Sequence, residues 1–103
     1  MTRFKLFAAA AAATVMAGAA HAAPCKDTTY VAQELEARLG EVPAYVGVMR
    51  NANLVRVYLN PTTERWTIVV EPHGRNLSCL VATGRGADRI ASRLQLDIDL
   101  EPV

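Results

Sequence analysis

Apolar residues recur at every fourth position between Asp27 and Gly40. They are Val31, Leu35 and Leu39. This spacing places them on one face of a helix, with Asp27 as the N-cap and Gly40 as the stop. Glu34 stands four residues before Arg38, the spacing of a stabilising ion pair on a helix. The pattern therefore predicts one short amphipathic helix.

The apolar period changes to two from residue 44 onward. Clusters rich in Asn, Pro and Gly interrupt the alternation at residues 50–53, 60–63 and 72–74, and such clusters are typical of turns. Four strands are predicted, at residues 44–49, 54–59, 66–71 and 77–83. Consecutive strands joined by short turns form an antiparallel meander.

Pairing Met49 with Leu54, and Leu59 with Trp66, makes the first three strands agree in register, because paired residues share a face. One face is then apolar and is the predicted core, with the amphipathic helix as its cover. Its members are Val46, Val48, Val55, Val57, Leu59, Trp66, Ile68 and Val70. The opposite face is mixed, and its members are Tyr45, Met49, Leu54, Arg56, Tyr58, Thr67, Val69 and Glu71. The register of the fourth strand stays open by one residue, so Cys79 is assigned to neither face.

After residue 83 the chain turns through two glycines into residues 87–94, where Ile90, Ala91 and Leu94 share a helical side. A second, shorter helix is expected there. Residues 96–100 alternate between apolar and acidic side chains, as in an edge strand or an ordered tail. The predicted fold class is α+β, with an N-terminal helix packed on a four-stranded antiparallel meander and a short C-terminal helix or tail.

Residues 1–22 have the pattern of a signal peptide. Arg3 and Lys5 precede an uncharged run at residues 6–20, and residues 20–22 (Ala-His-Ala) provide a cleavage site. Cleavage after Ala22 would leave a single small domain at residues 23–103. The run is shorter than the roughly 20 apolar residues that span a bilayer. We therefore expect a periplasmic or secreted protein without stable membrane insertion after cleavage.

The charge of the chain excludes some partners. The whole sequence has 11 Lys and Arg against 10 Asp and Glu. Two of the basic residues belong to the signal segment, so the mature protein has a net charge of −1. This near balance argues against nucleic acid or an anionic membrane surface as a default partner.

Cys25 and Cys79 are the two cysteines of the chain. In an exported domain this small, a disulfide is the expected state. A metal pair and a redox couple are the alternatives. Both are weaker, because there is no Cys-x-x-Cys spacing and His73 is the one histidine left after cleavage.

The remaining polar residues do not form a catalytic signature. His73 lies in a Pro-x-Gly turn, where an exposed histidine is expected, and Ser78 lacks the glycines of a nucleophile elbow. Asp97, Asp99 and Glu101 alternate like the exposed side of a strand and lack the pattern of a calcium loop. The sequence therefore predicts neither an enzyme nor a bound cofactor or metal.

The mixed face holds the best candidate for an interaction surface. Tyr45 and Tyr58 are expected to lie opposite one another, with Arg56 two positions along, and such side chains are enriched in interfaces. The alternative is that the second helix or the tail covers this face. We expect a non-catalytic accessory or interaction module, whose partner is another envelope protein or a second copy. A small-ligand or metal-binding protein, using His73 or the row of Arg85, Arg89 and Arg93, is the second hypothesis.

Residues 60–68 (Asn-Pro-Thr-Thr-Glu-Arg-Trp-Thr-Ile) and 79–84 (Cys-Leu-Val-Ala-Thr-Gly) form a combined pattern with the early Cys25. The pattern resembles small exported alphaproteobacterial proteins of uncharacterised function. The resemblance supports the disulfide and the fold but implies no activity. Those proteins commonly have Gly in place of Glu64, so we expect this hairpin turn to differ. The order of elements is also similar to that of PepSY-type modules, which are implicated in regulating exported enzymes.

Overall fold

The computed structural model describes residues 24–94 and 99–103. The predicted signal peptide at residues 1–22 and residues 96–98 of the predicted edge strand lie outside the described residues. Within the described residues, no helix has the length and apolar character needed to cross a membrane.

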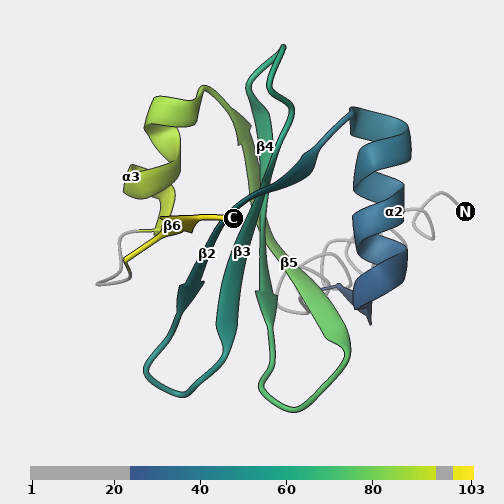
Figure 1. Cartoon of the computed structure of the whole chain (residues 1–103), viewed down its shortest axis with the longest axis vertical. Helices are drawn as coiled ribbons and strands as arrows, with labels where there is room; N and C mark the ends of the chain where they lie inside the picture. Colours follow the sequence, from purple (N-terminus) through teal and green to yellow (C-terminus); the bar gives the residue numbers. More distant parts are fainter. Residues whose placement is uncertain (1–23, 95–98) are drawn as a thin grey trace, which may run out of the picture.

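One six-stranded antiparallel sheet and two short helices make up the described fold (Figure 1). In chain order the elements are β1 (Cys25–Asp27), α2 (Thr28–Leu39), β2 (Val42–Val48), β3 (Leu54–Leu59), β4 (Arg65–Glu71), β5 (Leu77–Arg85), the 3₁₀ turn η1 (Ala87–Arg89), α3 (Ile90–Leu94) and β6 (Glu101–Pro102). The strand order across the sheet is β1-β5-β4-β3-β2-β6.

The α+β class is confirmed, but the sheet has six strands and not the predicted four. The predicted strands are its four central ones, in chain order from β2 to β5. The two additional strands are three and two residues long. Segments this short contain no measurable alternation, so periodicity alone does not reveal them.

Helix α2 begins and ends as the sequence predicts. The Asp27 carboxylate accepts a hydrogen bond from the Tyr30 N–H at 3.1 Å, which satisfies one of the free donors of the first turn. Gly40 ends the helix in the left-handed conformation at φ +65°. Arg38 Nε lies 2.6 Å from the Glu34 carboxylate. No residue of this helix is fully buried.

The register between β2 and β3 corrects the predicted one. Leu59 pairs with Trp66 as expected, but Leu54 pairs with Val48 and not with Met49. Met49 instead closes the turn, its N–H donating to the Asn53 carbonyl at 2.8 Å. A shift of one residue exchanges the faces of a strand, so Val46 and Val48 do not belong to the core face.

The hydrophobic core lies on one face of the sheet, here called the α3 face. Its fully buried members are Val55, Val57, Trp66, Ile68 and, from α3, Ile90. Ala87, Leu94 and Leu100 pack against this cluster from the C-terminal segment. The predicted core strands are therefore covered by the C-terminal helix and not by the N-terminal one. Figure 1 shows the two helices on opposite sides of the sheet.

The hairpin turn between β3 and β4 connects the sheet to the C-terminal helix. Glu64 adopts the left-handed conformation at φ +63°, which glycine occupies most readily. Its backbone carbonyl accepts from the Gly86 N–H at 2.9 Å, and its carboxylate accepts from the Ala87 N–H at 3.1 Å. The turn thus keeps a glycine-like backbone while the glutamate side chain holds the start of η1.

Trp66 fixes the centre of the α3 face. Its indole N–H donates to the Gly86 carbonyl at 2.8 Å, and its ring lies against Gly84, the directly paired residue of β5. A Cβ atom on Gly84 would stand 2.4 Å from Trp66 Cζ2. Position 84 therefore requires glycine because of the close approach of the ring.

Replacing Gly84 by alanine is expected to lower the free energy of unfolding by about 1–3 kcal/mol, because the Trp66 ring must move in a packed core. Urea denaturation measures the change. Gly74→Ala is the matched control: position 74 is open, and its φ of +75° leaves only a backbone cost of about 1 kcal/mol. Equal stability of Gly84→Ala and the wild type would contradict the proposed packing.

Candidate functional site

The opposite face of the sheet, here called the α2 face, differs from an ordinary core. Its members are Arg56, Tyr58, Thr67, Val69, Glu71 and Ser78. Most of them are polar, and several are buried. Buried polar groups are costly unless they are paired, so this layer differs in kind from the apolar layer of the α3 face.

A groove of about 350 Å³ runs between α2 and strands β4 and β5. Its lining is Pro24, Lys26, Tyr30, Val31, Glu34, Leu35, Arg38, Thr67, Val69, Ser78 and Leu80. Thr67 and Val69 are fully buried, whereas Tyr30 and Leu80 are 45% and 39% exposed. The groove exists because the apolar stripe of α2 is narrow, and Val31 and Leu35 are only half-buried.

The mouth of the groove carries charged side chains. Lys26 Nζ lies 5.4 Å from the centroid of the Tyr30 ring, a cation–π contact. Arg38 is held by Glu34. Both Lys26 and Arg38 are basic, and Glu34 is the one acidic residue of the lining. The groove is therefore an apolar recess with a slightly positive rim.

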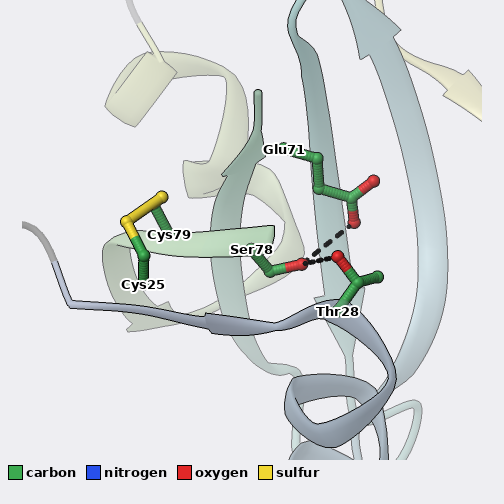
Figure 2. The surroundings of a disulfide bond; sticks show 5 residues. All are labelled: Cys25, Thr28, Glu71, Ser78 and Cys79. Atoms are coloured by element: carbon green, nitrogen blue, oxygen red, sulfur yellow. Dashed lines mark hydrogen bonds between the residues drawn. A yellow bond between two sulfur atoms is a disulfide. The ribbon is translucent and has the colours of Figure 1, made fainter. Parts of the chain in front are cut away.

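At the start of α2, a polar network ties the helix to the sheet (Figure 2). Arg56 donates two hydrogen bonds to the Glu71 carboxylate, at 2.9 Å and 3.3 Å. Ser78 Oγ lies 3.3 Å from Glu71 Oε2 and 3.2 Å from Thr28 Oγ1. The hydrogen bond to Glu71 raises the pKa of the Arg56 guanidinium, although burial opposes this effect. These contacts keep both charges compensated in a partly buried place.

The structure does not bring Tyr45, Arg56 and Tyr58 together as one interaction face. Tyr45 pairs with Val57 and therefore lies on the α3 face, where it lines a hollow of about 170 Å³ with Ile90. The cause is the one-residue register shift at the turn, because β2 pairs continuously from Val48 with Leu54 to Tyr45 with Val57.

Arg56 and Tyr58 do share the α2 face, but neither is a free contact residue. The Tyr58 side chain is almost completely buried. Burial raises the pKa of its phenol, the negative charge of Glu71 raises it further, and Arg56 opposes both. Arg56 is bound to Glu71 and its side chain is 25% exposed, so both side chains are engaged within the protein.

Glu41 is a buried acid that the sequence analysis missed, because a glutamate after a helix stop has the appearance of an exposed loop residue. It is 0% exposed. Neither carboxylate oxygen forms a hydrogen bond, and the hydroxyl of nearby Thr67 is also unpaired. Arg65 Nε lies 4.0 Å away. Burial raises the pKa of Glu41, and the Thr67 hydroxyl and the Arg65 charge only partly oppose this rise.

Because the pKa of Glu41 is raised by burial, the free energy of unfolding should depend on pH. Below the ordinary pH range of carboxylic acids, Glu41 is protonated in both the folded and the unfolded protein. As the pH rises, the unfolded protein loses this proton first, because its pKa is the lower one. The free energy of unfolding therefore falls. The stability of Glu41→Gln relative to the wild type should therefore increase as the pH rises above the ordinary carboxylic acid range, by about 1 kcal/mol. Urea denaturation at several pH values checks this, with Glu36→Gln on the exposed side of α2 as control. A constant difference between wild type and Glu41→Gln would count against it.

The predicted disulfide is present and joins β1 to β5. Cys25 and Cys79 are directly paired residues of β1 and β5, 54 positions apart in sequence. In Figure 2 the disulfide lies on one side of β5 and Ser78 on the other. The Leu80 N–H donates to the Pro24 carbonyl at 2.9 Å. Because α2 follows β1 immediately, the bond fixes the position where the helix starts.

The other candidate residues lie apart from this groove. His73 is exposed in the turn after β4, its N–H bound to the Asn53 side chain at 2.8 Å. The arginine row is not one helical face: Arg85 ends β5, whereas Arg89 and Arg93 belong to η1 and α3. Asp97 lies outside the described residues. Across residues 24–94 and 99–103, no group of three His, Cys, Asp or Glu side chains is placed to hold a metal ion.

No protein-family model, curated protein or solved structure gives a significant match to this chain. The function of the groove is therefore inferred from its shape, burial and charge.

Proposed function

We propose that this protein is an exported, non-catalytic interaction module, acting in the periplasm or outside the cell, and that the α2 groove is its recognition surface. The signal-peptide pattern supports export, and the disulfide is compatible with an oxidising compartment. The observation that carries the recognition site is the apolar recess with the partly exposed Tyr30 and Leu80 at its mouth.

Recognition would use the recess as an anchor pocket. A large apolar side chain of a partner, once inserted between Leu35 and Val69, loses its water contact, and buried anchors of this kind dominate the energy of interfaces. The disulfide and the Asp27 cap hold α2 before binding, so little ordering is required when the partner arrives.

Site-specific photo-crosslinking in producing cells tests this proposal. A benzoylphenylalanine in place of Leu80 should give a defined protein adduct. The same substitution at Val48, an exposed aliphatic residue of β2 near the opposite edge of the sheet, is the matched control and should give none. The partner, identified by mass spectrometry, should bind the purified protein and lose binding to a Leu35→Trp variant. Adducts from Val48 alone, or from neither position, would reject the groove as the recognition surface.

Binding of a small molecule is the second candidate, and one observation favours it. Thr67 lines the groove and is 1% exposed. Its hydroxyl lies beside the Glu41 carboxylate but forms no hydrogen bond of good geometry. A hydrogen bond between a ligand and this hydroxyl would remove the free-energy cost of a buried, unpaired polar group. A ligand at 100 times its dissociation constant should stabilise the oxidised protein by about 2.7 kcal/mol in a thermal-shift panel. The Thr67→Val variant should lose that stabilisation if the hydroxyl is the contact.

A further inference from the structure

The outer edge of β5 is only partly covered. β1 pairs with Leu77, Ser78 and Cys79, and the Pro24 carbonyl receives the N–H of Leu80. Val81 is an extra residue in the register with β4, and residues 82–85 then pair regularly with β4 again. No strand among the described residues pairs with the outer side of residues 82–85. Leu80 and Val81 at this edge are 39% and 54% exposed.

The opposite edge of the sheet is protected differently. β6 pairs with Tyr45 and Val46, and the Val103 N–H donates to the Ala44 carbonyl at 3.0 Å. Before this pairing β2 contains Pro43 and the bulge that follows it, and after it only Gly47 and Val48 lack a described outer partner. Prolines and bulges prevent strand addition at sheet edges. Among the described residues, residues 82–85 of β5 are therefore the longer edge segment without a partner strand.

The open edge and the α2 groove adjoin one another. Leu80 lines the groove and lies two residues before the open part of β5. β1 runs antiparallel to β5 and already occupies the first part of the edge. An added strand in line with β1 would pair with residues 82–85 of β5 in the same antiparallel direction. Every second side chain of such a strand points to the same face of the sheet. One set of its side chains would thus face the side of the sheet where the groove lies.

The charges around this edge select the occupant. Arg85 stands directly across from Arg65, and Lys26 lies at the mouth of the groove. Within the described residues, neither Arg85 nor Lys26 has an acidic partner. An acidic strand would supply the missing negative charge, whereas a basic one would be repelled.

We propose that the β5 edge at residues 82–85 takes an extended acidic peptide segment of a partner protein as an additional antiparallel strand, with an apolar side chain of that segment in the α2 groove. Backbone hydrogen bonds give such strand addition its affinity, and the groove gives its specificity. This inference rests on the proposed function and names the class of partner.

The test uses the oxidised mature protein and synthetic peptides followed by fluorescence anisotropy. The probe is a labelled Val-Glu-Val-Asp-Val-Glu peptide, which alternates apolar and acidic residues and does not occur in this chain. Its control replaces every acidic residue by lysine. We expect the acidic probe to bind at least about tenfold more tightly. N-methylation of one alternate set of peptide nitrogens should abolish binding, whereas methylation of the other set should leave it nearly unchanged, because only one edge of the added strand faces β5.

Protein variants locate the binding on this edge. Arg85→Glu and Leu35→Trp should each weaken binding about tenfold or more. Arg93→Glu is the matched control on α3 and should have no effect. Equal loss from both N-methylated peptides, or no binding of the acidic probe, overturns strand addition. If the Leu80 crosslink persists in that case, the groove remains the recognition surface; if the crosslink is absent too, both proposals fail. Self-association through the same edge, detected by light scattering, would identify a second copy as the occupant and overturn the foreign peptide.

Discussion

Loss of the disulfide between Cys25 and Cys79 is expected to lower the free energy of unfolding by about 4 kcal/mol, from the chain entropy of a loop this long. That loss is comparable with the whole stability of many small domains. The effect is large here because β1 has only three residues, and few other contacts hold the start of α2 to the sheet.

Urea denaturation of the oxidised wild type, the reduced wild type and a Cys25→Ser/Cys79→Ser variant measures this loss. The reduced protein and the double variant should unfold at similar, much lower urea concentrations. Reductant should leave the double variant unchanged, which controls for other effects of the reagent. An oxidised wild type that unfolds at the same urea concentration with and without reductant would refute the proposed role of the bond.

Replacing Trp66 by alanine is expected to lower the free energy of unfolding by about 3–5 kcal/mol. The indole is buried at the centre of the α3 face, fills the space over Gly84, and binds the Gly86 carbonyl just before η1. Its removal therefore leaves a cavity and also releases the segment that leads to α3.

Trp66→Phe separates the two contributions. Phenylalanine keeps part of the packing and loses the indole N–H. In urea denaturation, the free energy of unfolding of Trp66→Phe should therefore lie between those of the wild type and Trp66→Ala. An alanine variant as stable as the phenylalanine variant would show that the ring does not fill the core as described.

Local features of this fold follow from particular residues. Asp27 and Gly40 predict both ends of α2, and the pairing of Leu59 with Trp66 was correct. The pairing of Met49 with Leu54 was wrong, because Met49 belongs to the turn. Met49 is as apolar as the strand residue before it, so periodicity cannot place the boundary within one residue.

The site was less predictable than the fold. Which helix covers which face depends on contacts between distant segments, and the apolar stripe of α2 fits either face. The predicted Tyr45 is on the wrong face for the proposed surface, whereas Leu80 and Thr67 were not singled out. Their importance arises only when α2 is placed over β4 and β5. Glu41 also gains its meaning from burial, which its neighbours in sequence do not indicate.

The most direct test of this account is a nuclear Overhauser spectrum of the oxidised mature protein with labelled methyl groups. The central claim is that the two helices cover opposite faces of one sheet. Methyl groups of Leu35 should show contacts to Val69 and Leu80, and those of Ile90 should show contacts to the Trp66 ring. Contacts from Leu35 to the Trp66 ring, or from Ile90 to Val69, would place both helices on the wrong faces and contradict the account.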